Sequence, residues 1–171
     1  MSVTIRQARA EEAELLAAIE AECFPPAEAA SEEEIKKRMQ AFLENFFVAE
    51  TEGKVVGFIN GAVTDRQYLP DEMYHDIRLH QPQGDYQTVF GLNVLPGYRH
   101  RGIAGKLLDT LAEVSGKRGK KGVILTCKEH LIPFYENHGF VNYGRADSQH
   151  GMAQWYDMRN LFSQREKRNV L

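Results

Sequence analysis

The chain has 171 residues, of which 43% are hydrophobic and 26% are charged, and this composition excludes disordered, collagen-like and coiled-coil proteins. The length fits one domain whose core is large enough to need no disulfide. With 21 basic and 24 acidic residues the net charge is -3, so we expect no general affinity for nucleic acid. No apolar run approaches the roughly 18 residues of a membrane span, so we expect no membrane association. Two cysteines and no leader-like segment after Met1 favour the reducing cytoplasm.

The first elements expected along the chain are a strand and a helix. Alternating apolar and polar residues predict a strand over residues 3–7. The helix that follows is expected to end before Pro25-Pro26, because proline neither continues a helix nor leaves its predecessor helical. The residues expected on its apolar face are Leu15, Leu16, Ile19 and Cys23.

A second helix and a hairpin are expected next. Ser31 followed by Glu34 predicts a capping box at the start of the helix. Two strand-like runs, over residues 46–50 and 54–63, enclose Thr51-Glu52-Gly53, and this spacing predicts a β-hairpin. The residues expected to form the buried stripe of this helix are Ile35, Met39, Phe42 and Leu43.

The second half of the sequence alternates strands with helices. Residues 66–86 are polar, contain prolines and show no period, and irregular stretches of this length are often binding loops. A strand is expected over residues 88–95. The other expected elements are a helix over 103–114, a strand over 122–126, a short helix over 131–137 and strands over 140–141 and 153–158. This order predicts an α/β (α+β) fold with a mixed sheet covered by helices on both faces.

The most informative segment joins the strand that ends near Leu95 to the helix that begins near Ile103. Gly102, Ala104 and Gly105 keep side-chain bulk away from the amides of the first helical turn, which point outward at the positive end of the helix dipole. The residues that add positive charge around this turn are Arg99, His100, Arg101 and Lys106. The combination predicts a diphosphate site, although an ordinary basic helix start is the alternative. Neither a Walker loop nor a dinucleotide fingerprint is present.

Two motifs in this half resemble those of the GNAT acyltransferase superfamily. Arg99-x-x-Gly102-x-Ala104 resembles its signature, and Val94-x-Pro96-x-Tyr98 resembles the usual lead-in. Phe134-Tyr135 followed by Gly139-Phe140 resembles a later motif, and the order of elements fits over residues 3–158. The resemblance implies a GNAT-like, mostly antiparallel central sheet, one domain over residues 1–160 and a tail over 161–171.

Within the superfamily the chain is most similar to the arylalkylamine (serotonin) N-acetyltransferase branch. The similarity lies in residues 22–31, in residues 125–135 and in Gln154-Trp155-Tyr156-Asp157-Met158. Vertebrate enzymes of that branch have a His-x-His pair where this chain has Thr88 and Phe90. Their histidine-linked proton route is therefore absent here.

The resemblance implies transfer of an acetyl group from acetyl-CoA to a primary amine, such as a small arylalkylamine, by direct attack in a ternary complex. The amide of Leu92 is then expected to bind the thioester carbonyl and stabilise its negative charge. The expected acetyl-CoA contacts are Leu92, Asn93, Val94, Arg99, His100, Arg101, Gly102, Ile103, Ala104, Gly105 and Lys106.

Proton transfer at the reacting atoms requires further groups. The resemblance makes Tyr135 the donor to the departing thiolate, although a core aromatic role explains this residue too. For the general base we expect Glu28 first, His80 second and a chain of water molecules third. The residues expected to line the amine site are Phe24, Pro25, Glu28, His80 and Phe90, and ordinary core packing explains the aromatic members equally well. The six histidines form no compact ligand pattern, so no metal is expected.

Two other functions fit the same sequence. A protein, peptide or polyamine acceptor would suit the acidic residues of the 66–86 loop. A degenerate, non-catalytic acyl-CoA-binding regulatory module would suit the loss of the histidine pair at Thr88 and Phe90. We expect a monomer or homodimer in each case.

Overall fold

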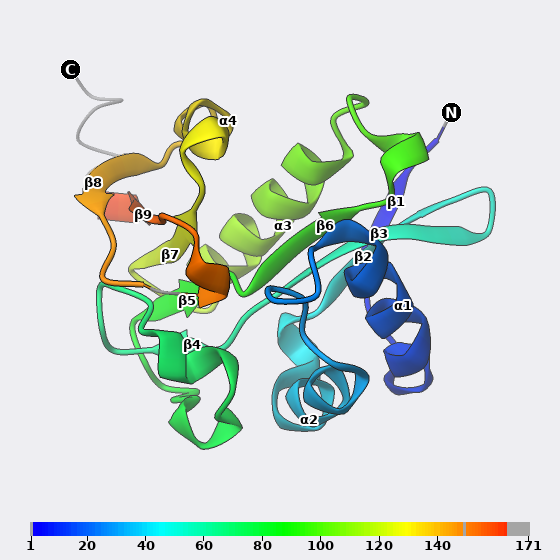
Figure 1. Cartoon of the computed structure of the whole chain (residues 1–171), viewed down its shortest axis with the longest axis horizontal. Helices are drawn as coiled ribbons and strands as arrows, with labels where there is room; N and C mark the ends of the chain where they lie inside the picture. The colour runs from blue at the N-terminus through cyan, green and yellow to red at the C-terminus, as the bar shows by residue number, and fades with distance from the viewer. Residues whose placement is uncertain (1, 149, 164–171) are drawn as a thin grey trace. The chain divides into compact units, whose positions relative to one another are not determined.

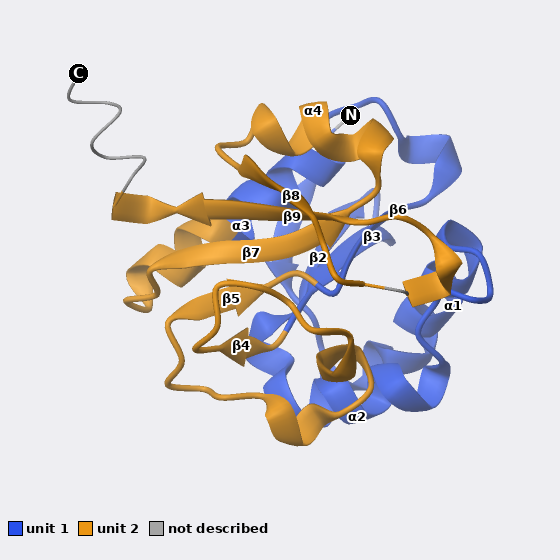
Figure 2. Cartoon of the chain, turned by 60° about the vertical axis from the view of Figure 1, so that its left-hand side comes forward, with its two compact units in different colours: residues 1–61, 90–111 blue, residues 62–89, 112–171 orange. Residues whose placement is uncertain are grey.

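The computed structural model describes residues 2–148 and 150–163 (Figure 1). The chain forms two compact units, residues 1–61 with 90–111 and residues 62–89 with 112–171, which Figure 2 draws in different colours. The expectation of one domain over residues 1–160 stays a prediction, and the expected tail lies outside the described residues from position 164 onward. None of the described helices is long and apolar enough to cross a membrane.

The first unit contains an antiparallel sheet with strand order β1-β2-β3-β6, so β6 lies at its edge. Glu52 and Gly53 join β2 to β3 with φ of +52° and +75°. Two left-handed residues form the type I′ turn that suits a two-residue hairpin, so the predicted hairpin is confirmed. The elements of this unit are β1 (Thr4–Gln7), α1 (Ala13–Cys23), α2 (Glu32–Phe42), β2 (Phe47–Thr51), β3 (Lys54–Asn60) and β6 (Gly91–Val94), with α3 (Ile103–Lys117) beginning here.

The two helices α1 and α2 lie side by side, and α1 also contacts β3 and β6 (Figure 1). The Ser31 hydroxyl accepts a hydrogen bond from Glu34 N–H at 3.1 Å, and Ser31 N–H donates to Glu34 Oε1 at 3.1 Å, which confirms the capping box. Leu15 was expected to be buried but is 45% exposed. The buried face of α1 is centred on Leu16 and Glu20, one turn apart, so Leu15 falls at its margin.

The second unit contains a mixed sheet with strand order β4-β5-β7-β9-β8. Here β5 and β7 are parallel and the other described pairs are antiparallel, which confirms a mixed, mostly antiparallel fold. The 66–86 loop contains short 3₁₀ turns at Asp71–Tyr74 and Ile77–Leu79. The elements of this unit are β4 (Val63–Thr64), β5 (Tyr86–Thr88), β7 (Gly122–Cys127), α4 (Ile132–Glu136), β8 (Val141–Arg145) and β9 (Tyr156–Leu161).

The prediction of one continuous strand over residues 88–95 is wrong. β5 ends at Thr88 and β6 begins at Gly91, and the two strands belong to different sheets. The chain changes partners between them, because Val89 N–H donates to Ile124 O at 3.1 Å whereas Phe90 N–H donates to Asn60 O at 2.7 Å. The expected strand over residues 54–63 is divided in the same way into β3 and β4.

Candidate active site

The turn that opens α3 has the backbone geometry of an anion site. His100 and Gly102 have φ of +64° and +81°, so left-handed residues flank Arg101 in the turn. Lys106 N–H donates to Gly102 O at 3.1 Å and closes the first helical bond. The amides of residues 103–105 precede that bond, so they point outward, whereas Lys106 can bind an anion only through its exposed side chain.

Positive charge gathers beside this turn. The Tyr98 ring lies 5.6 Å from Lys54 Nζ and 5.6 Å from Arg101 Cζ, so both cations face the same aromatic ring. Arg99 Nε donates to Val94 O at 2.8 Å, which fixes this side chain against the end of β6. Lys54 begins β3 and was not expected near this turn. It lies far from Tyr98 in the sequence, so the sequence alone gives no indication that the two residues are in contact.

The edge strand β6 presents alternate backbone groups away from β3. Leu95 N–H donates to Val56 O at 2.9 Å, and hydrogen-bonded pairs alternate with non-hydrogen-bonded pairs in an antiparallel ladder. The pairs Ile59–Leu92 and Gly57–Val94 are therefore non-hydrogen-bonded. The N–H and C=O groups of Leu92 and Val94 consequently face away from the sheet, as the contact of Arg99 with Val94 O requires.

Tyr135 belongs to the second unit and is buried in α4. Its ring packs edge-on against Phe134 and Phe140, with centroid separations of 5.0 and 5.6 Å. Burial raises the pKa of Tyr135 above its ordinary value, and the neighbouring Cys127 and Tyr74 raise it further. The phenol therefore holds its proton over the whole physiological pH range.

Two further residues of the second unit, Cys127 and Tyr74, act electrostatically on this phenol. Burial raises the pKa of Cys127 to about 12, with a further contribution from Glu136, so its thiol stays protonated and is a poor nucleophile. Cys127 is not disulfide bonded. Tyr74, from the 66–86 loop, forms a hydroxyl–hydroxyl hydrogen bond of 3.1 Å with Thr126 at the end of β7. The loop is thereby attached to the strand that leads towards α4.

The residues expected at the amine site divide between the units. Phe24, Pro25 and Glu28 lie in the loop between α1 and α2, where Glu28 N–H donates to Pro25 O at 2.9 Å. Phe90 belongs to the same unit and packs edge-on against Phe42 at 6.1 Å between centroids. Phe24, Glu28 and Phe90 are half-buried, and Pro25 is exposed.

His80 lies in the second unit, in the 66–86 loop. Its Nδ1 accepts a hydrogen bond of 3.0 Å from Val63 N–H. The neutral ring must then carry its proton on Nε2, so the lone pair that a base needs is already engaged. His80 Nδ1 is therefore not available as a proton acceptor, and the identity of the base stays a prediction.

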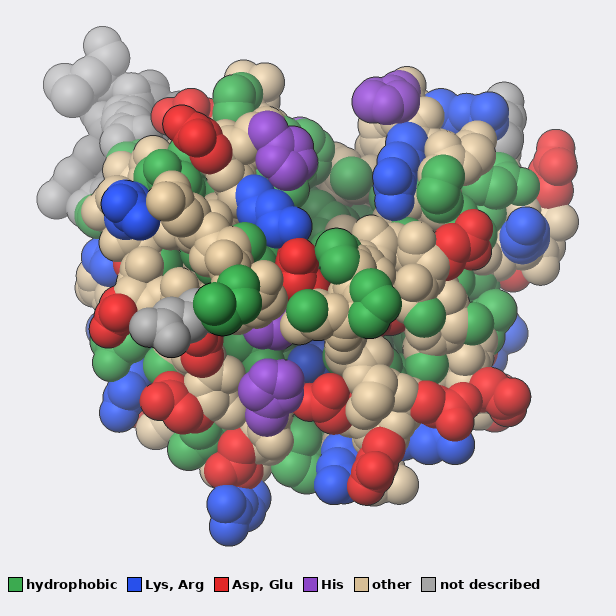
Figure 3. All heavy atoms as spheres, in the orientation of Figure 1, with side chains coloured by type: hydrophobic (Ala, Val, Ile, Leu, Met, Phe, Trp, Pro, Cys, Tyr) green, Lys and Arg blue, Asp and Glu red, His purple; other side chains and the backbone are tan. Residues whose placement is uncertain are grey.

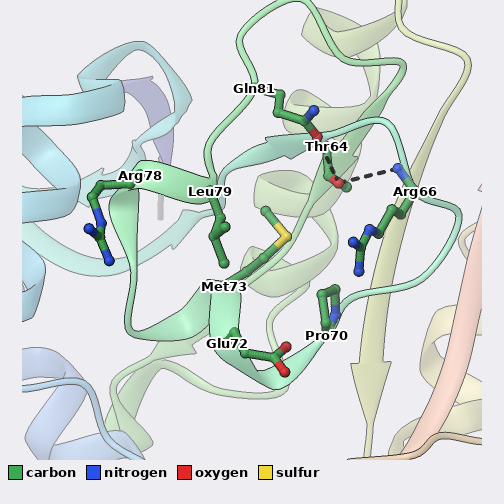
Figure 4. Close-up of a pocket in the computed structure, with 8 residues that line it drawn as sticks. All are labelled: Thr64, Arg66, Pro70, Glu72, Met73, Arg78, Leu79 and Gln81. Carbon is green, nitrogen blue, oxygen red and sulfur yellow. Dashed lines mark hydrogen bonds between the residues drawn. The ribbon is translucent and has the colours of Figure 1, made fainter.

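The 66–86 loop encloses a pocket of about 450 Å³ in the second unit. Thr64 Oγ1 contacts Gln81 at 3.4 Å and accepts from Arg66 N–H at 3.2 Å at one side of this pocket (Figure 4). The residues that line it are Thr64, Arg66, Pro70, Glu72, Met73, Arg78, Leu79 and Gln81. The lining thus carries both basic and acidic side chains.

Two acids of this loop already have cationic partners. Asp76 pairs with Arg78 at 2.9 Å, and Asp85 pairs with Lys121 at 3.2 Å. Figure 3 shows acidic and basic side chains interspersed over one face of the molecule. Two of the acids that a polycationic acceptor would contact are therefore paired with cations of this chain, and the class of the acceptor stays a prediction.

Sequence reasoning missed one buried polar cluster in the first unit. Glu20, Asn60 and Asn93 are at most 4% exposed, and Arg38 is 3% exposed. The signal was present in the helices, because Glu20 and Arg38 occupy positions within otherwise apolar stripes. Among residues 2–148 and 150–163, no group of three or more His, Cys, Asp or Glu side chains is placed to hold a metal ion.

Comparisons with known proteins agree with this geometry. Residues 13–140, which are more than half of the chain, match the model of the acetyltransferase (GNAT) family. The chain belongs to this family. An uncharacterised N-acetyltransferase of Bacillus subtilis is 28% identical over 127 residues, which make up 67% of this chain and 55% of that protein. Serotonin N-acetyltransferase of Mesocricetus auratus is 32% identical over 94 residues, which make up 54% of this chain and 44% of that enzyme.

The chain thus spans about half the length of these curated GNAT relatives. A solved structure, the GNAT-like decarboxylase GphF in complex with isobutyryl-CoA, superposes with a TM-score of 0.78 at 20% identity. The superposition covers 92% of this chain and 98% of that one. At this identity the likeness concerns the fold alone, and it confirms the GNAT fold predicted from the two motifs.

Proposed function

We propose that this GNAT protein is an acetyl-CoA-dependent N-acetyltransferase whose acceptor is a small primary amine of the arylalkylamine class. The observation that carries the proposal is the turn before α3, with its left-handed residues at His100 and Gly102 and with Lys54 and Arg101 beside the Tyr98 ring. An acyl-CoA carries a diphosphate, the group that outward N–H donors at a helix start bind best. The acetyl thioester of bound acetyl-CoA supplies the activated acyl group.

Two groups of residues in this chain are suited to bind acetyl-CoA. The amides of residues 103–105 and the side chains of Arg101 and Lys106 would bind the diphosphate. The outward N–H groups of Leu92 and Val94 would pair with the extended arm of the donor as an added strand does. Val94 O already accepts from Arg99 Nε, so the outward groups left for this pairing are the N–H groups of Leu92 and Val94 and the C=O group of Leu92.

Leu92 N–H is the donor we assign to the thioester carbonyl. A backbone amide held in a sheet needs no reorganisation to stabilise negative charge on that oxygen. The loss of one such donor from an enzyme costs on the order of 3 kcal/mol of transition-state stabilisation. The pairs Phe58–Asn93 and Asn60–Gly91, on either side of Leu92, hold β6 against β3 and keep this amide in place.

Tyr135 is the proton donor we assign to the departing thiolate. Its ordinary pKa of about 10 already exceeds that of a thiol at about 8.5, and burial raises the pKa of Tyr135 further. Full ionisation of the phenol is therefore unfavourable. Tyr135 is expected to donate a hydrogen bond that becomes proton transfer late in the reaction.

Glu28 is the base we assign to the amine. An alkyl ammonium with a pKa near 10.4 is neutral in only about one molecule in a few thousand at pH 7, so a nearby proton acceptor is required. Glu28 is half-buried in the loop that also carries Phe24, and the ring at Phe90 belongs to the same unit. The unit thus supplies aromatic rings and a carboxylate, the two features that an arylalkylammonium would require, because it joins an apolar ring to a cation.

The test is release of free thiol from acetyl-CoA in the presence of arylalkylamines, polyamines and lysine peptides. We expect turnover to be fastest with an arylalkylamine and to require acetyl-CoA. Faster turnover with polyamines or peptides would refute the arylalkylamine acceptor but would still support acetyl transfer to an amine. Binding of acetyl-CoA by calorimetry, without turnover on any amine, would identify a binding module and refute the proposed catalysis.

A further inference from the structure

The buried carboxylate of Glu20 lies at the junction between two segments of the first unit. On one side, Glu20 Oε2 accepts a hydrogen bond of 2.9 Å from Ala30 N–H, at the end of the loop between α1 and α2. On the other side, Oε1 faces β6, where a Cβ built on Gly91 would lie 3.4 Å from Glu20 Oε1 and 3.3 Å from Asn93 Nδ2. One side chain thus contacts the loop and the edge strand.

Both segments belong to the proposed site. The loop carries Phe24 and Glu28, which we assign to the amine, and β6 carries Leu92, which we assign to the thioester. Leu92 lies directly between Gly91 and Asn93, the two residues that face Glu20. Because the Glu20 carboxylate contacts both segments, it sets the position of the loop that would bind the amine relative to the strand that would bind the acetyl group.

The cluster around Glu20 is polar and closely buried. Glu20 Oε1 and both amide atoms of Asn93 form no hydrogen bond of standard geometry with any described residue. Burial raises the pKa of Glu20, and the Ala30 N–H bond and the nearby Asn93 amide oppose that rise. Buried polar atoms in this state lose free energy unless a partner or an ordered water completes them, so a sequence retains them only against a cost to stability.

Arg38 extends the cluster to the proposed amine site. Its Nη1 donates to Asn60 Oδ1 at 3.4 Å, and its Cζ lies 4.7 Å above the ring of Phe90. Asn60 O also accepts the N–H of Phe90 at 2.7 Å. Phe90 is therefore held at its backbone by Asn60 and at its ring by Arg38. The positive charge of Arg38 also stabilises the ionised form of Glu20. Phe90 is thus linked through Arg38 to Glu20, which contacts the loop between α1 and α2.

We propose that Glu20 is a positioning residue, which with Asn93 fixes the loop between α1 and α2 against β6 so that the amine meets the acetyl group in line. This inference rests on the proposed acetyl transfer. Misplacement of reacting groups by about 1 Å costs on the order of 100-fold in rate, whereas binding of the distant diphosphate is untouched. Loss of Glu20 should therefore lower kcat and leave acetyl-CoA affinity unchanged.

The substitution Glu20→Gln tests this with little change in volume. Glutamine has one acceptor oxygen, so it can satisfy Ala30 N–H or face the Asn93 amide as an acceptor, but not both. We expect kcat to fall about 10- to 100-fold, with the Kd for CoA by calorimetry within about twofold of its original value. The matched control is Glu14→Gln, which removes an exposed acid from the same helix and should leave kcat unchanged.

A reciprocal exchange separates positioning from simple loss of stability. Adding Asn93→Asp to Glu20→Gln places the carboxylate on β6 and the amide on α1, so the pair is restored with its members exchanged. We expect the double variant to recover a large part of kcat. Unchanged kcat in Glu20→Gln, or failure of the exchange to recover any activity in a protein that melts like the original, would overturn the inference. Absence of thiol release from the original protein with every amine would overturn the proposed function first, and this inference with it.

Discussion

Gly102→Ala tests the anion turn through its backbone alone. Gly102 has φ of +81°, and a Cβ built there would meet no atom within 4 Å, so steric contact contributes nothing. The left-handed conformation costs a residue other than glycine about 1–2 kcal/mol. The strained turn can be relieved only by leaving this conformation, so the cost appears in folding stability, in ligand affinity or in both.

The sum of the two losses should therefore come to about 1–2 kcal/mol, which corresponds to a weakening of CoA binding by at most about 5- to 30-fold. Calorimetric titration with CoA measures the affinity, and urea unfolding measures the stability. Gly97→Ala is the matched control, because Gly97 lies in the same segment between β6 and α3, in the 3₁₀ turn Pro96–Tyr98, is equally open and has no left-handed φ. Equal CoA affinity in all three proteins, with stability also unchanged, would refute the reasoning.

Three further outcomes are expected. Tyr135→Phe should lower kcat by 10-fold or more, on the order expected for loss of general acid catalysis, while the Kd for CoA is retained; unchanged turnover would dismiss its role. Glu28→Gln should lower kcat/KM for the amine and alter the acidic limb of the pH–rate profile, and an unaltered limb would remove Glu28 as the base. Glu20→Gln should become more stable relative to the original protein as pH rises, which urea unfolding at a series of pH values would show. Burial raises the pKa of Glu20, with Glu34 acting in the same direction and Arg38 against it, so the native state binds this proton more tightly than the unfolded state. The resulting stability is present below the unfolded pKa of about 4.3 and is lost as pH rises through the native value. If the difference in unfolding free energy between Glu20→Gln and the original protein does not change with pH, the raised pKa of Glu20 is contradicted.

Local signals in the sequence predicted the elements that depend on neighbouring residues. Ser31 and Glu34 lie three residues apart, so their capping box could be identified without any tertiary contact. The Glu52-Gly53 turn is equally local, and the helix after Gly102 follows from apolar spacing. The glycines and basic residues before Ile103 are contiguous too, so this turn could be identified from the sequence, and its role as an anion site stays a prediction.

Contacts between distant residues could not be predicted in this way. The division of the expected 88–95 strand depends on Ile124 and Asn60, which offer different partners to Val89 and Phe90. Glu20 and Asn93 are far apart in sequence, and a single chain gives no sign that a carboxylate in α1 faces an amide in β6. The polar positions within apolar stripes were visible, but their partners were not.

The backbone orientation of β6 has a consequence for how this region can vary. Its outward donors at Leu92 and Val94 belong to the main chain, so exchange of one side chain for another leaves them in place. Only proline removes an N–H group, and only a change of register would turn it inward. A surface built from peptide groups can therefore keep one ligand while the residues around it diverge, and the variation that alters acceptor choice is free to accumulate in the loops.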